Sequence, residues 1–274
     1  MSFTSMMVHQ NVDAHNDSRL QIAANLAQRF GAKLIGIAAC EVNPPAYASG
    51  AFASAIFNEL RLQTESKLKE AAVRFSASAE GNVREIEWRQ AFAKPIAYVA
   101  QEGRAADVII TGAARDSAYF DPFTQLDPGD LIMQAGRPVL IVPPEAESLE
   151  AKHVLVAWKD TREARRAVLD ALPFLQAATD VTVVEVGSRA EIKYAARRGE
   201  DVAGWLERHG VCAAANAIVA SEQPFEALEA LLLQNAADLV VAGAYGHSRV
   251  QEWIFGGVTR DLLTKARCCC LFAH

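Results

Sequence analysis

The sequence predicts an α/β fold built from two tandem, doubly wound, Rossmann-like parallel sheets of five strands each. Two observations predict it. Short apolar runs alternate with helix-like patterns along all 274 residues, as expected of parallel βαβ units. The pattern also restarts halfway: FAKPIAYVAQEGRAADVIITGA at 92–113 parallels SEQPFEALEALLLQNAADLVVAGA at 221–244, and GRPVLIVP at 136–143 parallels ARCCCLFA at 266–273. We therefore expect two copies of one domain.

The boundary between the copies lies in the Pro-rich, acidic segment PPEAESLEAK at 143–152. We assign residues 1–143 to the first domain, 144–152 to a linker and 153–274 to the second domain. Ligands of doubly wound sheets bind beyond the carboxyl ends of the strands, where the strand order reverses. A site is therefore expected after the first and fourth strands of a domain.

In the first domain, Asp17 or Ser18 can cap a helix that runs to Phe30 with apolar residues at helical spacing. The run KLIGIAA at 33–39 predicts a strand buried on both faces. Residues 42–55, rich in Pro, Ala, Gly and Ser, predict a loop. The expected strands are 6–10, 33–39, 83–88, 107–112 and 138–142, and the expected helices are 17–30, 57–79, 96–101 and 130–134.

The second domain repeats this order. The helix at 162–175 carries an apolar face of Ala164, Ala167, Val168, Ala171 and Leu172. The expected strands are 153–158, 180–186, 215–220, 238–243 and 268–273, and the other expected helices are 191–209, 225–234 and 256–266.

The stretch DLVVAGAYGHSRVQEWIFGGVTR at 238–260 has the order of an anion site: a strand, a glycine turn, a loop, and small residues that open a helix. Glycines let a ligand approach the main chain closely. The first N–H groups of a helix have no partner within the helix, and the dipole there favours negative charge. A phosphate between the two ends of this stretch is the natural interpretation.

This stretch resembles the universal stress protein family, whose pattern is Gly, two residues, Gly, nine residues, Gly, then Ser or Thr. The residues that fit are Gly243, Gly246, Gly256, Val258 and Thr259, whereas Gly257 stands at the Ser/Thr position. Losing one hydroxyl hydrogen bond costs about 1 kcal/mol, roughly a factor of five in affinity. The resemblance covers essentially the whole chain and implies a cytoplasmic tandem member that binds ATP, which Mg²⁺ could accompany. It also implies that strands 138–142 and 268–273 pair within one molecule, which makes the two domains an intramolecular pseudo-dimer related by a pseudo-twofold axis, and it leaves a further homodimer open.

The resemblance places the nucleotide pocket of the second domain at the ends of its first and second strands. The residues there are Ala157, Trp158, Lys159, Asp160, Thr161 and Val186. The family usually has Asp where this chain has Lys159, and a lysine cannot accept a hydrogen bond from ribose or adenine. Asp160, one residue later, is either a ligand contact or, with Thr161, a cap of the helix at 162. Val186 fits equally well as ordinary core.

Two further residues, His247 and Arg249, lie in the loop over the expected phosphates. Arg249 could pair with a phosphate oxygen or remain a solvated loop charge. In the first domain Gly112 is kept, but Arg115 replaces the second glycine, and Asp127 and Asp130 would repel phosphate at the helix start. We infer that the first domain has lost the nucleotide site, which leaves it a structural role or another ligand.

Composition excludes several other classes. The net charge of −6 and the pI near 5.6 argue against nucleic acid as a partner. The start MSFTSMMVHQ has no signal-peptide pattern, and no apolar run is long enough for a membrane span. The five cysteines suggest a reducing compartment, and Cys268, Cys269 and Cys270 fit packing better than metal binding because strand side chains alternate. The scattered histidines suggest no metal site.

The sequence favours a binding module over an enzyme. Gly246, His247 and Ser248 approach a hydrolase nucleophile elbow, but the closing glycine is missing and the helix begins too late. The chain has no P-loop sequence. The leading hypothesis is a stress-response ATP-binding module with its site in the second domain. The alternatives are a degenerate scaffold that acts through protein contacts or another small ligand, and slow ATP hydrolysis that depends on Asp160.

Overall fold

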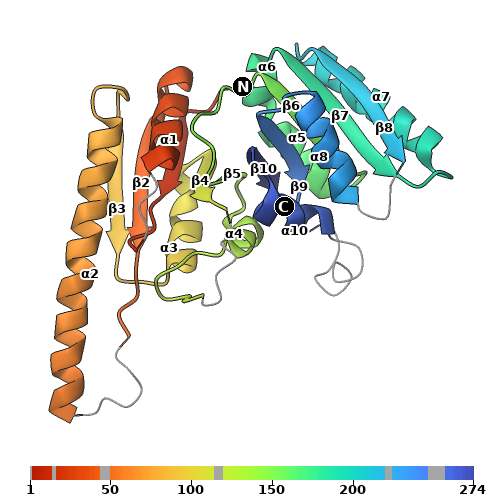
Figure 1. The fold of residues 1–274 in the computed structure, drawn as a ribbon. Coiled ribbons are helices and arrows are strands. Elements are labelled where there is room, and N and C mark those ends of the chain that lie inside the picture. Colours follow the sequence, from red (N-terminus) through yellow and green to blue (C-terminus); the bar gives the residue numbers. More distant parts are fainter. Residues whose placement is uncertain (1, 14–16, 44–49, 114–119, 220–223, 246–256) are drawn as a thin grey trace.

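A computed structural model describes residues 2–13, 17–43, 50–113, 120–219, 224–245 and 257–274. Their strands form one ten-stranded sheet in the order β3-β2-β1-β4-β5-β10-β9-β6-β7-β8 (Figure 1). The strands are β1 Ser5–His9, β2 Lys33–Ala39, β3 Ile86–Ala91, β4 Val108–Gly112, β5 Val139–Val142, β6 His153–Trp158, β7 Asp180–Gly187, β8 Ala213–Val219, β9 Leu239–Gly243 and β10 Cys269–Ala273. The prediction of an α/β fold with doubly wound, largely parallel strands is confirmed, and the sheets of the two halves are joined into one.

The two sheets merge because the last strands of the two halves pair with each other. β5 and β10 run antiparallel, with Leu140 opposite Leu271 and Val139 opposite Phe272, whereas the other strand pairs are parallel. Each half thereby loses an apolar edge strand that would otherwise invite pairing with another chain. Cys269 and Cys270 are buried in β10, which confirms the packing interpretation of these two cysteines.

Helices cover both faces of the sheet. The described helices are α1 Asp17–Phe30, α2 Gly50–Ala79, α3 Pro95–Glu102, α4 Pro128–Ala135, α5 Arg162–Asp170, α6 Leu172–Ala177, α7 Ile192–Arg208, α8 Pro224–Gln234 and α10 Gly257–Lys265, with a 3₁₀ turn at Gly103–Ala105. One core contains buried residues of α1, α2, α5, α6 and α7. The other contains buried residues of α3, α4, α8 and α10. Both cores continue from one half of the chain into the other, as expected of a single sheet with two helical layers.

Three aromatic rings join the halves on the first of these faces. Phe3 and Phe30 of the first half lie 5.0 Å and 5.5 Å from Phe174 of α6, measured between ring centroids. Leu149 and Ala151 of the expected linker are also buried in this core. The segment at 143–152 therefore packs against the body of the protein.

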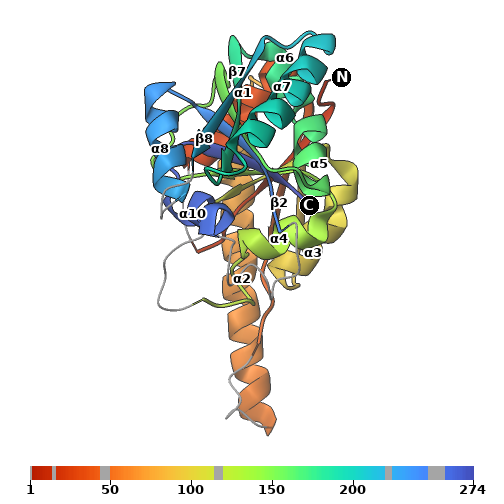
Figure 2. The same ribbon diagram turned by 90° about the vertical axis from the view of Figure 1, so that its right-hand side faces the viewer.

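The sequence misplaced three elements. Helix α2 already begins at Gly50, inside the expected loop at 42–55, and Figure 2 shows its first turns extending well beyond the sheet. β3 starts at Ile86 rather than at 83. The helix expected at 162–175 is divided into α5 and α6, since Pro173 at the start of α6 lacks the N–H that a continuous helix needs. No helix among the described residues is both long enough and apolar enough to cross a membrane.

Candidate functional site

The strand order of the second half reverses between β6 and β9. These two strands are parallel neighbours, with Ala157 beside Ala242, but they are connected to helices on opposite faces of the sheet. β7 lies on the other side of β6, with Trp158 beside Glu185. The carboxyl ends of β6, β7 and β9 therefore bring Lys159, Val186 and the glycine turn to one edge. This edge is where doubly wound sheets bind ligands.

Gly243, at the end of β9, is covered by the start of helix α5. A Cβ atom added to Gly243 would lie 2.6 Å from the carbonyl carbon of Glu163 and 2.8 Å from Cα of Ala164, and it would also meet the backbone nitrogen of Ala164. Backbone atoms cannot move aside as a side chain can. The glycine is therefore required by helix packing, whereas the sequence suggested that it admits a ligand.

The residues after β6 form the cap of α5. The hydroxyl of Thr161 accepts a hydrogen bond from the backbone N–H of Ala164 at 3.3 Å, so Thr161 is the N-cap residue. Asp160 is exposed and forms an ion pair with Arg165. The cap interpretation thus holds for Thr161, while Asp160 is held by an arginine rather than by the helix N-terminus. Lys159 is exposed at the same edge.

A buried carboxylate that the sequence did not single out lies in the first turn of α5. The side chain of Glu163 is 1% exposed and pairs with Arg162, whose side chain is 80% exposed. Burial raises the pKa of the Glu163 carboxyl, but hydrogen bonds from Arg162, its own backbone N–H and Thr161 outweigh burial and leave the pKa below its usual value. Glu163 is therefore negatively charged at neutral pH, in the turn that covers Gly243.

Two buried polar atoms near this turn have no hydrogen-bond partner among the described residues. They are Oε2 of Glu163 and Nε1 of Trp158. Trp158 lies in the same core as Ala164, so its indole packs on the α5 face of the sheet. A donor and an acceptor are thus available where β6 ends.

The end of β7 contributes a second acidic residue that the sequence analysis missed. Glu185 is 5% exposed, and its carboxylate accepts hydrogen bonds from Nε and Nη2 of Arg198 in α7. The alternation of strand side chains places Glu185 on the α7 face and the half-buried Val186 on the opposite face. This position is compatible with both interpretations of Val186, as a contact for the nucleotide base and as a core residue.

The turn after Gly243 is tied to the C-terminus and to the first half. Ala244 donates its N–H to the carbonyl of Ala273 at 2.9 Å, and its carbonyl lies 3.0 Å from Nδ1 of His274. Tyr245 has a positive φ of 59°, and its hydroxyl lies close to Gly129 in α4. The glycine turn thus contacts the domain that was expected to lack a nucleotide site.

Helix α10 begins at Gly257, and Val258 and Thr259 are half-buried in its first turn. These three residues lie where the resemblance places the second half of the phosphate site. The other predicted contacts, Gly246, His247, Arg249 and Gly256, lie outside the described residues, as does Arg115 of the first half.

The equivalent edge of the first half lies between β1 and β4. A Cβ atom added to Gly112 would lie 2.6 Å from Nη1 of Arg19, a side-chain atom, so here the glycine faces a guanidinium instead of helix backbone. Arg19, Gln10 and Thr111 are 6%, 4% and 2% exposed. Asp127, expected to repel phosphate, caps α4 by accepting a hydrogen bond from the N–H of Asp130 at 2.8 Å.

Comparison with known proteins matches residues 150–274 to the universal stress protein family. The second half of the chain is a universal stress protein domain. The family recognised from the glycine spacing is thereby confirmed. No curated protein matches the sequence significantly.

Solved structures extend the likeness in fold to both halves. A universal stress protein from Archaeoglobus fulgidus superposes with a TM-score of 0.73 at 16% identity, covering 98% of this chain and 95% of that one. A functionally unknown protein from Pseudomonas aeruginosa superposes with a TM-score of 0.61 at 14% identity, covering 99% and 92%. The tandem arrangement of universal stress protein folds therefore spans the whole chain.

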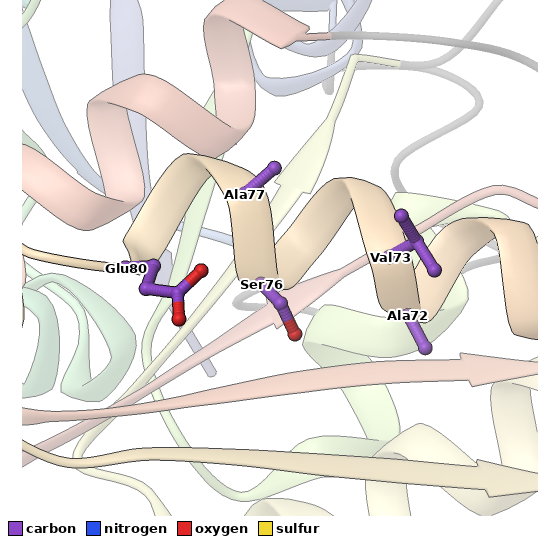
Figure 3. A pocket seen from close by; sticks show the side chains of 5 residues that line it. All are labelled: Ala72, Val73, Ser76, Ala77 and Glu80. Carbon is purple, nitrogen blue, oxygen red and sulfur yellow. The ribbon is translucent and has the colours of Figure 1, made fainter.

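We call the two places where the strand order reverses, between β1 and β4 and between β6 and β9, the switch points. Away from them, a surface hollow of about 330 Å³ lies on α2. It is lined by four residues of α2 and by the residue directly after the helix, namely Ala72, Val73, Ser76, Ala77 and Glu80 (Figure 3). α2 ends there, before the chain enters β3, so the hollow lies toward the amino ends of the strands and away from the universal stress protein site. Among the described residues there is no cluster of three or more His, Cys, Asp or Glu side chains suited to a metal ion.

Sequence reasoning missed the polar residues that distinguish the two switch points, namely Glu163, Glu185, Arg198, Gln10 and Arg19. Glu163 and Arg19 each resemble ordinary polar residues in the first turn of a surface helix, where Glu is favoured by the dipole. Gln10 at the end of an apolar run was the one available signal, because a strand buried on both faces rarely ends in a buried amide.

Proposed function

We propose that this chain is a stress-response module that binds an adenine nucleotide at the carboxyl edge of β6 and β9. The observation that supports it best is the coincidence of the family's glycine motif with the strand-order reversal: the turn of Gly243 leaves β9 there, and α10 opens with Gly257 in the same domain. The family match over residues 150–274 supports the same ligand class.

Each described residue has a role in this proposal. The N-terminal N–H groups of α10 around Gly257, Val258 and Thr259 would hold phosphate. Lys159 is exposed at the same edge and would add a positive charge close to it. Val186 offers an apolar surface to the base. ATP itself, with Mg²⁺ beside it, is the proposed form of the ligand, and the cytoplasm is the proposed location.

Binding rather than catalysis is proposed for this site. Asp160, the first carboxylate after β6 in the sequence, is held in an ion pair with Arg165, so it is less available to activate water. Slow ATP hydrolysis remains the alternative, and it predicts that turnover falls in Asp160→Ala. A turnover unaffected by that substitution would remove Asp160 from any catalytic role.

A second candidate function is a scaffold that acts through protein contacts without nucleotide. Two observations favour it: α5 covers Gly243, and the buried charge of Glu163 lies in that turn. A negative charge in a region of low dielectric constant weakens phosphate binding, and the exposed Arg162 offsets only part of it.

The deciding experiment measures nucleotide directly. The purified protein is denatured, its supernatant is separated by chromatography, and ATP is titrated calorimetrically into protein freed of ligand. We expect about one nucleotide per chain, and loss of binding in Gly246→Arg, which copies Arg115 of the first half into the second. No nucleotide and no heat in the unsubstituted protein would favour the scaffold.

Lys159→Asp provides the matched gain of function, because it restores the family residue that accepts hydrogen bonds from the nucleoside. Lys152→Asp, an exposed lysine before β6 at the opposite edge of the sheet, is the control for the change in charge. We expect the first substitution alone to change the preference for adenosine over inorganic triphosphate. Equal effects of both would argue against contact between position 159 and the nucleoside.

A further inference from the structure

The first half has a buried arginine and a buried glutamine at the point where its own strand order reverses, between β1 and β4. Extending the β1–β4 register, in which Val8 lies beside Ile110, places Gln10 beside Gly112 on the α1 face of the sheet. The guanidinium of Arg19 comes down from α1 onto Gly112, with Nη1 2.6 Å from the position of an added Cβ. The guanidinium and the side-chain amide thus lie on the same face of the sheet at the end of β1, and both residues are more than nine-tenths buried.

The amide nitrogen of Gln10 has no hydrogen-bond partner among the described residues. Leaving a buried polar group without a partner costs about 1–3 kcal/mol, and most buried amides in proteins are paired. Gln10 directly follows β1, whose last four residues are buried, so an apolar residue would fit the fold at lower cost. The amide therefore points to a ligand with acceptor atoms.

A second buried polar side chain, His9, precedes Gln10 in the chain and lies on the opposite face of the sheet. His9 Nδ1 is 3.2 Å from the hydroxyl of Thr111, while His9 Nε2 has no partner among the described residues. Burial, helped by the charge of Arg19, lowers the pKa of His9 to about 3, so the ring is neutral at physiological pH. The positive charge at this edge thus belongs to Arg19, whose five N–H donors can serve a ligand in addition to bonds within the protein.

We propose that the first half binds a compact oxyanion at Gly112, held by the guanidinium of Arg19 and the amide of Gln10. A planar guanidinium binds phosphate or carboxylate oxygens in bidentate fashion, and the amide N–H groups supply further donors. The missing side chain of Gly112 leaves room for the guanidinium to reach the main chain. The site needs no nucleotide motif and is independent of the nucleotide proposed for the second half.

The end of β6 in the second half lacks both of these groups. The position that corresponds to Gln10 is Trp158, and the first turn of α5 carries the negative charge of Glu163 where α1 carries Arg19. An anion site made of a buried guanidinium and a buried amide is therefore expected once per chain, in the first half.

The test titrates inorganic phosphate, sulfate and acetate separately into the full chain, followed by calorimetry and thermal unfolding. We expect saturable binding of one anion per chain, with the preferred anion separating phosphate from carboxylate sources. General stabilisation by phosphate or sulfate salts does not saturate and gives no stoichiometric heat. Absence of saturable binding for all three anions would overturn the proposal.

The informative variant is Gln10→Leu, which keeps the volume and removes the donors. We expect its affinity for the anion to fall at least tenfold, while its melting temperature without anion rises because an unpaired buried amide is gone. Unchanged affinity would overturn the proposal. Arg19→Met should abolish binding, and Arg166→Met, on the exposed face of α5, should leave it intact. If Arg19→Met does not fold, Gln10→Leu alone decides.

ATP binding is measured in the same variants. We expect Gln10→Leu to retain whatever ATP binding the unsubstituted chain shows, because the two switch points lie in different halves of the sheet. Failure of the anion site and failure of the nucleotide site are thereby distinguished.

Discussion

The two halves of this protein place a glycine at the same point of the same fold and surround it with opposite charges. Gly112 and Gly243 both end the fourth strand of their half, beside the end of the first strand. Gly112 faces the flexible end of Arg19, whereas Gly243 faces the backbone of α5 at Glu163 and Ala164. The first half thus has a buried cation where the second has a buried carboxylate.

This difference shows that a repeated fold can keep its packing and change its chemistry. The strand order and the two helical layers need apolar residues at fixed positions, and both halves supply them. The switch point lies beyond the last layer of that packing, so charge can vary there without disturbing the sheet. Four predictions test whether the two edges differ as described, from the largest expected effect to the smallest.

Replacing Gly243 by alanine should destabilise the protein far more than replacing Gly112 by alanine. In Gly243→Ala the new methyl group meets helix backbone, and we expect a loss of about 3 kcal/mol in the free energy of unfolding. In Gly112→Ala it meets the far end of Arg19, which can rotate away, so the loss should be below about 1 kcal/mol. Urea denaturation of both variants measures this, and equal losses would show that α5 does not press on Gly243.

The buried histidine gives the first half a pH dependence. Unfolded chain protonates His9 near pH 6.5, while the folded protein does so only near pH 3, because the pKa is lowered to about 3 by burial and by Arg19. Between these values the unfolded state binds more protons, so the free energy of unfolding falls as the pH falls through this window.

We therefore expect the unsubstituted protein to lose about 2 kcal/mol more than His9→Asn between pH 7 and pH 5. The asparagine amide can keep a hydrogen bond to Thr111 but does not titrate. Denaturation curves at several pH values compare the two proteins. Parallel pH profiles would mean that His9 is not buried in its neutral form.

Neutralising the carboxylate of the second half should strengthen nucleotide binding. Glu163→Gln keeps the shape of the side chain and removes its charge from the turn that covers Gly243. We expect the affinity for ATP to rise about tenfold, equivalent to about 1.4 kcal/mol. Calorimetry measures it, with Glu226→Gln on the exposed face of α8 as a control. A rise in both variants would indicate a general charge effect.

Removing the cap of α5 should have the smallest effect. Thr161→Ala deletes the hydroxyl that accepts from the N–H of Ala164, and we expect a loss of about 1 kcal/mol in stability. Thr161→Ser should retain the stability, because serine caps equally well. If the alanine and serine variants are equally stable, the hydroxyl of Thr161 contributes nothing to stability through the cap.

The sequence by itself determined the repeat, the alternation of strands and helices, and the glycine spacing from 243 to 257, because these depend on local periodicity and backbone freedom. The family resemblance implied that β5 and β10 would pair, and this pairing joins the two halves into one sheet. The sequence placed some helix and strand boundaries wrongly. For example, the Pro-, Ala- and Gly-rich composition predicted a loop where α2 begins.

Only the tertiary structure decided what lies against each glycine. Glu163 and Gly243, or Arg19 and Gly112, are far apart in the sequence and meet because a helix crosses the end of a neighbouring strand. Whether a charge in a helix turn is buried or solvated depends on that crossing, and the energy of a charge depends on its burial. The fold could therefore be predicted from the sequence, whereas the burial of the charges that distinguish its two edges could not.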